Sequence, residues 1–267
     1  MNLKELFIEY KSDKYTHGYH IVYDNYFKYL RNKKLNILEI GVSDGASMQA
    51  WANYFKRSKI IGIDIKKINL KKKRLNKKNI YIYQGSQSDK KFIDFLIKKY
   101  KKFDIIIDDG SHYPSDVINS FKFLFNSLSN NGLYFVEDTQ TSYNHFFGGN
   151  AFDLKYSNTQ INFFKNISDS VNYQEIANPY YKKNRYDGLI KSVSFYNNMI
   201  VINKDKNKIK SNLLINNSYE DKRYLTKISR NKKKKFLYFI KYKIIFKTFT
   251  LSLYLLYLIK KFLLFRF

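Results

Sequence analysis

Acidic and amide side chains follow five apolar segments of this chain, at positions where buried strands would end. The chain holds only 22 Asp and Glu residues among 267, so five such positions in succession would seldom arise by chance. In an open α/β sheet, ligands bind beyond the carboxyl ends of the strands. The first candidates for a binding or catalytic site are therefore Glu39 with Gly41, Asp64, residues 84–87, residues 108–112, and Glu137 with Asp138.

Residues 39–45 (EIGVSDG) have the form of a turn between a strand and a helix. Glycines in such a turn allow the backbone to approach a bound group closely. The spacing differs from the dinucleotide motif G-x-G-x-x-G, and the Lys-Ser/Thr pair of a phosphate-binding P-loop is absent. Asp64 ends the next apolar segment, 23 residues after Gly41, where a carboxylate accepts hydrogen bonds from a ribose diol. Together these residues indicate a nucleoside-binding site.

Short apolar runs alternate with longer amphipathic ones, which predicts βαβ units. Strands are expected at 35–42, 59–65, 79–84, 103–108 and 133–136, and helices at 47–57, 89–100 and 114–128. Two further strands, 191–196 and 199–204, flank a hairpin turn at Asn197 and Asn198. We therefore expect an α/β, Rossmann-like fold. It consists of an open, mostly parallel seven-stranded sheet with helices on both faces and an antiparallel C-terminal hairpin.

The motif series at 39–45, Asp64, 85–89 and 103–109 resembles that of class I S-adenosylmethionine-dependent methyltransferases. Residues 105–112 (IIIDDGSH) and 135–143 (FVEDTQTSY) narrow this resemblance. They are similar to the metal-dependent sugar O-methyltransferases of macrolide antibiotic tailoring, the mycinamicin and demethylmacrocin type. Shorter matching segments lie at 12–14, 17–19, 23–27 and 194–196, so the resemblance covers about residues 10–205.

The resemblance implies two cofactors, S-adenosylmethionine and a divalent cation, usually Mg²⁺. It implies that His112 is the general base, three positions after a metal-binding Asp109. The expected metal ligands are Asp109, Asp138 and Asp24, the last standing where the family has a glutamate. The residues expected to bind the methyl donor are Glu39, Gly41, Gly45, Asp64, Gln87 and Asp109.

Local chemistry agrees with these implied roles. Mg²⁺ prefers carboxylate oxygens in a shell shared with water and substrate, and Asp109 and Asp138 follow neighbouring expected strands. An imidazole in the short loop after Asp109 can accept a proton from a hydroxyl near neutral pH. Glu137 is an alternative to Asp138 as a ligand, because Asp108 and Glu137 are also 29 residues apart.

Composition divides the chain into three parts and excludes several classes of protein. Residues 1–34 are expected to form an N-terminal helical lid or substrate segment, residues 35–205 the catalytic domain, and residues 206–267 a basic, aromatic helical tail. The chain has no cysteine, which excludes a disulfide scaffold, a thiolate nucleophile and Cys-based metal sites. The N-terminus lacks the apolar region of a signal peptide, so the cytoplasm is the expected location.

The tail is the expected contact with an anionic membrane surface. No acidic residue follows Asp221, and Lys-flanked Leu, Tyr and Phe suit a helix lying in a membrane interface. Its longest uncharged run, 248–259, is shorter than the about 20 residues that span a bilayer. This favours a peripheral position at the inner face of the membrane. The alternative is that the tail packs on the body of the protein or on another subunit, and the sequence leaves open whether the protein forms a homo-oligomer.

These features predict a metal-assisted O-methyltransferase that acts on a sugar hydroxyl of a glycan, glycolipid or glycosylated metabolite. The partner would be a sugar-containing small molecule or a lipid-linked glycan, with residues 139–187 as a substrate loop. The net charge of +27 motivates a nucleic-acid methyltransferase as an alternative. Against it, the loop after the fourth strand reads DDGSH, whereas amino-methylating nucleic-acid enzymes carry N/D-P-P-Y/F there. A membrane-tethered, non-catalytic binding module is the third hypothesis.

Overall fold

The computed structural model describes residues 1–68, 78–176, 181–206, 248 and 251–256. The chain divides into two compact units. The first comprises Met1–Val171 and Tyr186–Asn207, and the second comprises Asn172–Arg185 and Lys208–Phe267. The sheet and the candidate site both belong to the first unit.

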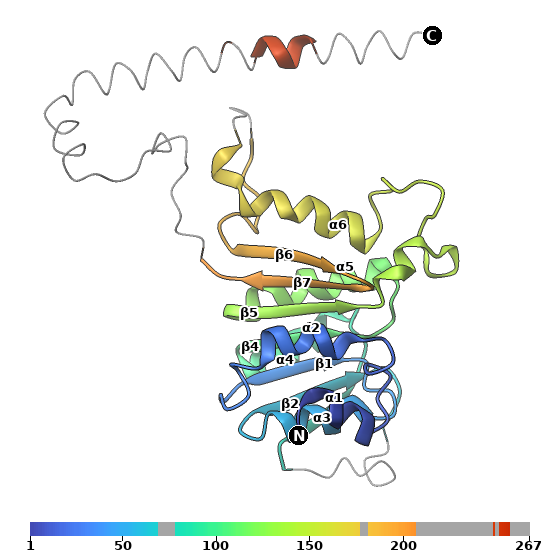
Figure 1. The fold of residues 1–267 in the computed structure, drawn as a ribbon. Coiled ribbons are helices and arrows are strands. Elements are labelled where there is room, and N and C mark those ends of the chain that lie inside the picture. The colour runs from blue at the N-terminus through green and yellow to red at the C-terminus, as the bar shows by residue number, and fades with distance from the viewer. Residues whose placement is uncertain (69–77, 177–180, 207–247, 249–250, 257–267) are drawn as a thin grey trace, which may run out of the picture. The chain divides into compact units, whose positions relative to one another are not determined.

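Seven strands form one sheet, in the order β3-β2-β1-β4-β5-β7-β6 (Figure 1). The pairs from β3 to β5 are parallel, and β7 runs antiparallel to both β5 and β6. This arrangement confirms the predicted mostly parallel sheet with an antiparallel C-terminal hairpin. The strands are β1 Asn36–Ile40, β2 Lys59–Asp64, β3 Ile80–Gln84, β4 Phe103–Asp108, β5 Leu128–Glu137, β6 Ile190–Tyr196 and β7 Met199–Lys204.

Helices lie between the strands, as βαβ connections require. The α-helices are α1 Leu3–Glu9, α2 Tyr19–Phe27, α3 Ala46–Tyr54, α4 Lys90–Tyr100, α5 Pro114–Leu124 and α6 Gln160–Ile167. Pro114 opens α5 at its first turn, where the missing N–H costs no hydrogen bond. Short 3₁₀ helices are η1 Phe125–Ser127, η2 Thr139–Tyr143, η3 His145–Phe147, η4 Ser168–Val171 and, in the second unit, η5 Tyr173–Glu175.

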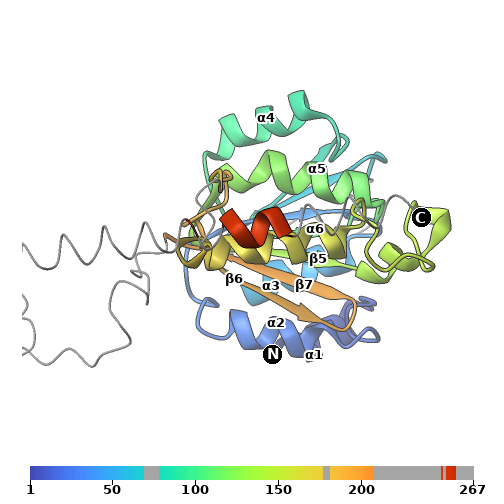
Figure 2. The same ribbon diagram turned by 90° about the horizontal axis from the view of Figure 1, so that it is seen from above.

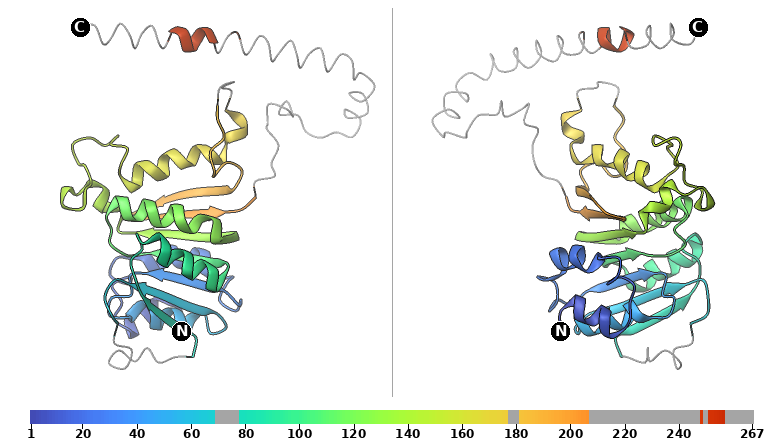
Figure 3. Two further views of the ribbon diagram at one scale, coloured as in Figure 1. Left: turned by 180° about the vertical axis from the view of Figure 1, so that it is seen from behind. Right: turned by 45° about the vertical axis from the view of Figure 1, so that its right-hand side comes forward.

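Two apolar cores cover the two faces of the sheet. Successive side chains of a strand point to opposite faces, so Ile37 packs with α1, α2 and α3, and Leu38 packs with α4, α5 and α6. Figure 2 shows the two helical layers with the sheet between them, and Figure 3 shows the same layers from behind. The predicted placement of helices on both faces is therefore confirmed.

The boundary between α5 and β5 differs from the prediction. Helix α5 ends at Leu124, and β5 begins at Leu128 instead of at residue 133. Leu128 pairs with Phe103, and the register then shifts. Asn131 has a φ of +59° within this strand. The polar residues before Gly132 interrupt the apolar pattern, so the sequence did not predict a strand for the first half of β5.

Residues 1–34 pack into the core of the first unit, so the expected boundary at residue 34 has no counterpart there. Tyr23 and Phe27 are fully buried and contact the rings of Trp51 and Phe135. The role of this segment as a lid stays a prediction. The expected substrate loop 139–187 also contains regular structure, because α6 buries Phe164 in the core of the opposite face.

Most of the predicted tail lies outside the described residues. Residues 251–256 are helical, and their leucine side chains are exposed. Within the ranges that the structure describes, no helix is both long and apolar enough to cross a membrane.

Candidate active site

The strand ends predicted to carry the site lie level at one edge of the sheet, on the right in Figure 1. Ile40 at the end of β1 pairs with Ile63 on one side and with Asp108 on the other. Asp108 in turn pairs with Val136, next to the end of β5. The residues that follow these strands therefore emerge side by side.

Gly41 forms the closest approach between two of these loops. Its φ is +87°, and an added Cβ would lie 2.0 Å from the carbonyl oxygen of Asp109. The two loops are also joined by the Asp109 N–H, which donates to Ile40 O at 2.9 Å. A side chain at position 41 would thus separate the turn after β1 from the loop that carries Asp109 and His112.

Asp64 is fixed by the backbone of the glycine-containing turn. Its Oδ2 accepts hydrogen bonds from the N–H groups of Val42 and Ser43 at 3.0 and 2.9 Å, and its Oδ1 accepts from Lys66 N–H at 2.8 Å. The carboxylate remains partly exposed. It lines a pocket together with Gly41, Gln87 and Gly110, so three of the expected donor-binding residues share one cavity.

Glu39 lies beneath this pocket and is fully buried. Its carboxylate accepts hydrogen bonds from Ser47 Oγ at 2.9 Å and Trp51 Nε1 at 3.2 Å. Burial raises the pKa of Glu39 to about 7, and the nearby Lys14 ammonium opposes this rise. Gly45 is the N-cap of α3. Glu39 therefore contacts this helix from β1 and Gly45 begins it, and neither residue lines the pocket.

Gln87 joins the pocket to the loop after β4. Its Nε2 donates to the buried Asp108 carboxylate at 3.1 Å, and its Oε1 accepts from Ser111 N–H at 2.8 Å. Burial raises the pKa of Asp108 to about 6. Asp108 also accepts hydrogen bonds from Ser120 and Tyr134, and this network orients the loop from Asp109 to His112.

Asp109 and Asp138, two of the three expected metal ligands, lie together with His112, the expected general base. One ligand atom from each lies within 4.8 Å of the other two. His112 Nε2 is 4.0 Å from Asp109 Oδ1 and 3.6 Å from Asp138 Oδ2. The three side chains are 20 to 24% exposed, so an ion and a small acceptor can reach them.

Lys14 is the main residue that the sequence analysis missed. Its side chain is 1% exposed, and its Nζ lies 2.6 Å from Asp109 Oδ2, 2.8 Å from both Glu137 oxygens and 3.5 Å from Glu39 Oε1. Burial alone would lower the pKa of Lys14, but the carboxylates raise it well above the usual value. A protonated lysine thus links the ends of β1, β4 and β5.

Two tyrosines of α2 hold the carboxylates at the end of β5. Tyr19 OH donates to Asp138 Oδ1 at 2.6 Å, and Tyr23 OH donates to Glu137 Oε1. Burial, the repulsion of Asp109 and the attraction of Lys14 act together on Glu137, and its pKa is raised well above the usual value. The N-terminal segment therefore contacts the acidic group through the hydroxyls of Tyr19 and Tyr23.

Asp24 is not brought to this group. It lies on α2, where burial raises the pKa of its carboxyl and the neighbouring His20 opposes this rise, and the three-residue group contains His112 in place of a third carboxylate. Glu137, the alternative to Asp138, is 2% exposed and engaged by Lys14 and Tyr23. Of the carboxylates at this edge, Asp109 and Asp138 are therefore the better placed pair to bind an ion.

The donor set fits Mg²⁺. Carboxylate oxygens are the ligands that this ion prefers, and it keeps several positions for water or substrate. Asp109 and Asp138 both present an oxygen toward His112, whereas Glu39 and Glu137 are buried beside the Lys14 ammonium, so the first two carboxylates are the ones that could hold the ion.

Comparison with known proteins agrees with this arrangement. Residues 21–171 match the family described as FtsJ-like methyltransferase. The chain is 33% identical over 216 residues to mycinamicin VI 2''-O-methyltransferase of Micromonospora griseorubida, a match that covers 77% of this chain and 53% of the relative. It is 32% identical to demethylmacrocin O-methyltransferase of Streptomyces fradiae, with 77% of this chain and 54% of the relative covered.

A solved structure shows the same fold. It is that of the MycE methyltransferase from the mycinamycin biosynthetic pathway in complex with Mg, SAH and mycinamycin VI. The TM-score is 0.73 at 32% identity, with 79% of this chain and 55% of that chain covered.

The chain thus spans about half the length of these relatives. The family match extends over more than half of the chain, and the predicted methyltransferase resemblance is confirmed: the chain belongs to the FtsJ-like methyltransferase family.

Proposed function

We propose that this chain transfers a methyl group from S-adenosylmethionine to a sugar hydroxyl, with Mg²⁺ bound at Asp109 and Asp138. The observation that carries the proposal is the contact between the two parts of the site. The pocket with Gly41 and Asp64 adjoins the loop that presents Asp109 and His112. The relatives named above are O-methyltransferases by their names, which supports a hydroxyl as the acceptor, and the resemblance of residues 105–112 and 135–143 to sugar O-methyltransferases supports a sugar.

The donor would lie in the pocket beside Asp64. That carboxylate is held rigidly by three backbone N–H groups, an orientation suited to a ribose diol. Gly41, Gly110 and Gln87 line this pocket, and the Gln87 side chain is held there by a hydrogen bond from the Ser111 N–H. Glu39 would support the turn from its buried side, since it is covered by Ser47, Trp51 and Lys14. Gly45 would act through the start of α3 and Asp109 from the neighbouring loop.

His112 is the proposed general base. Methyl transfer of this type needs the donor sulfur, the methyl carbon and the acceptor oxygen in line, with the base within reach of the hydroxyl proton, and little covalent help from the protein. His112 Nε2 faces the same space as the oxygens of Asp109 and Asp138, so a hydroxyl placed there can give up its proton to the imidazole. A bound Mg²⁺ supplies positive charge that lowers the pKa of a nearby hydroxyl.

The test uses the full chain, Mg²⁺ and S-adenosylmethionine with a panel of glycosides that carry vicinal hydroxyls. Mass spectrometry should detect a gain of about 14 Da, one methylene unit on a methylated oxygen, and S-adenosylhomocysteine should bind in a calorimetric titration. Absence of that binding would overturn the donor assignment. Methylation of RNA with no methylation of any glycoside would overturn the acceptor class.

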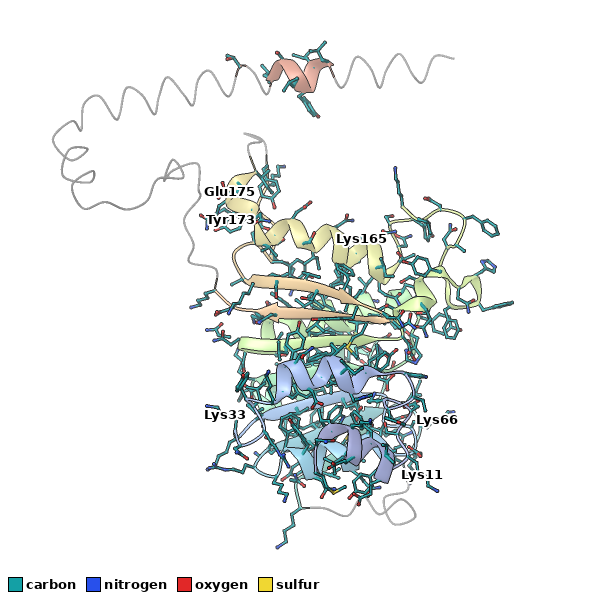
Figure 4. The ribbon with its side chains drawn as sticks, in the orientation of Figure 1. Lys11, Lys33, Lys66, Lys165, Tyr173 and Glu175 are labelled. Carbon is teal, nitrogen blue, oxygen red and sulfur yellow. The ribbon has the colours of Figure 1, made fainter. Side chains whose placement is uncertain are left out.

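The nucleic-acid alternative rests on the net charge of +27. Among the described residues, Lys11, Lys33, Lys66 and Lys165 are exposed and come from separate segments, and Figure 4 labels Lys33 on the side opposite to Lys11 and Lys66, with Lys165 apart from them on α6. Basic side chains that follow a nucleic-acid backbone would instead cluster along one face. This distribution favours the sugar acceptor.

We also propose that the basic tail holds the enzyme at an anionic membrane surface, close to a lipid-linked glycan. Its support is the sequence after Asp221, which has no acidic residue, together with the exposed leucines at 251–256. The full chain should sediment with vesicles that contain anionic phosphatidylglycerol and remain in solution with phosphatidylcholine vesicles. Equal recovery in both supernatants would overturn this proposal, and the oligomeric state in solution would then show whether the tail joins subunits.

A further inference from the structure

Thr141 lies behind the acidic group, on η2 between β5 and α6. Its side chain is buried, and its Oγ1 lies 2.9 Å from the backbone carbonyl oxygen of His112 and 3.0 Å from that of Asp138. The single hydroxyl hydrogen is shared between these two carbonyls. One side chain therefore joins the backbone of the proposed base to the backbone of a proposed metal ligand.

Both of these backbones are in a conformation that needs support. His112 has a φ of +59° and Asp138 a φ of +53°, in the left-handed region that non-glycine residues seldom occupy. Such conformations persist only where the surroundings determine them. The side chain of each residue faces the shared space from which Asp109 Oδ1 is also reached, so a change in either backbone would move a ligand or the base.

Gln160 anchors Thr141 to the opposite side of the loop. Its Nε2 donates to Thr141 Oγ1 at 2.8 Å, and the residue is fully buried at the start of α6. The neighbouring Ile161 N–H donates to Ser142 Oγ at 3.3 Å. The amino-terminal end of α6 thus fixes η2 in place, and η2 fixes His112 relative to Asp138.

We propose that Thr141 is a positioning residue of the active site, which sets the distance between His112 and Asp138 through their backbone carbonyls. The proposal rests on the function proposed above, because it assumes that Asp138 binds the ion. Residues that orient metal ligands typically affect metal affinity 10- to 100-fold when they are changed. Loss of this hydroxyl should therefore weaken Mg²⁺ binding even though Thr141 touches neither ion nor substrate.

The test compares Thr141→Val, which removes the hydroxyl at nearly constant volume, with Thr141→Ser, which keeps it. The control is Ser127→Ala, because Ser127 is a buried residue of η1 whose hydroxyl donates to Leu124 O at 2.6 Å, next to the start of β5 at the opposite edge of the sheet. Mg²⁺ alone is titrated into each full-length variant by calorimetry. The histidine Cε1–H NMR signal of His112, assigned by its loss in His112→Ala, reports the geometry of the ring.

Thr141→Val should bind Mg²⁺ about tenfold more weakly and shift the His112 signal, whereas Thr141→Ser should retain both properties. Ser127→Ala should lower the melting temperature without changing either. If Thr141→Val binds Mg²⁺ as tightly as the unaltered chain, or if Ser127→Ala weakens binding equally, the inference is overturned. If the unaltered chain itself binds no Mg²⁺, the proposed function fails first, so the two failures are distinguishable.

Discussion

The two edges of the sheet each hold a buried lysine, and the two lysines have different hydrogen-bond partners. At the carboxyl edge, Lys14 is buried among three carboxylates. At the opposite edge, the buried Lys204 donates to neutral backbone carbonyls, those of Phe125 at 2.8 Å and Leu128 at 2.6 Å. The N–H groups of Leu35 and Asn36 at that edge are likewise paired with single side chains, Ser58 and Asp104.

This contrast separates residues that support the fold from residues that serve a ligand. At the amino edge, local hydrogen bonds close the strand ends, and the Lys204 ammonium is paired only with neutral carbonyls. The carboxyl edge concentrates acids and left-handed backbone at His112 and Asp138, features that cost stability and cluster at functional sites. The difference indicates that the carboxyl edge is the functional edge of the sheet.

The largest effect should follow from His112→Ala. Without its proposed base, methyl transfer should fall about 1,000-fold, within the range typical of a general base, while S-adenosylhomocysteine binding is retained. His145→Ala is the matched control, because that histidine is exposed on η3. A loss of turnover in both variants, or in neither, would break the assignment of His112.

Lys14→Met should destabilise the fold more than Lys204→Met. Removing Lys14 leaves three buried carboxylates without their ammonium, a change worth about 3–5 kcal/mol in the free energy of unfolding. Removing Lys204 leaves only carbonyls unpaired, worth about 1–3 kcal/mol. Urea unfolding of both variants at pH 7 measures this difference, and an equal loss in the two would erase the distinction between the edges.

Gly41→Ala should damage the donor site and the fold together. The left-handed φ costs an alanine about 1–2 kcal/mol, and the added Cβ would meet Asp109 O at 2.0 Å, which adds about 1–3 kcal/mol of overpacking. Gly18→Ala is the control, since Gly18 has a φ of +73° but no atom within 4 Å of its Cβ position. If the two variants lose the same stability and Gly41→Ala still binds S-adenosylhomocysteine normally, the close approach has no functional importance.

The smallest effect is a pH dependence at the amino edge. Burial lowers the pKa of Lys204 to about 8 in the folded state, from an ordinary value of 10.5. Between these two values the unfolded chain binds more protons than the folded chain, so this residue makes the free energy of unfolding rise with pH. The unaltered chain should therefore gain stability from pH 8 to pH 10 relative to Lys204→Met, and a constant difference across this range would contradict the assignment.

The sequence was informative wherever periodicity and strand ends coincide. Strands such as β4 are apolar at nearly every position, because both of their faces are covered, and the polar residues after them had to meet at one edge. This predicted the proximity of Asp109, His112 and Asp138 without any knowledge of side-chain geometry. It also predicted the antiparallel hairpin of β6 and β7 from Asn197 and Asn198.

Contacts between distant segments could not be predicted in the same way. Lys14 is 95 residues from Asp109 and 123 from Glu137, and lysine is almost never buried unless paired. A signal was present, since the segment 12–14 belongs to the motif series, but its role depends on the packing of α1 and α2. Asp24 was placed by analogy with a glutamate ligand, and the turn of α2 directs it toward His20 instead.

The most direct measurement is the position of a metal ion at the carboxyl edge. Crystals of the full chain grown with S-adenosylhomocysteine and Mn²⁺, with data collected at the manganese absorption edge, would locate the ion by its anomalous signal. We predict one strong peak between the carboxylates of Asp109 and Asp138, beside His112 and next to the nucleoside in the Asp64 pocket. A donor bound in that pocket with no peak between the two aspartates would contradict the account.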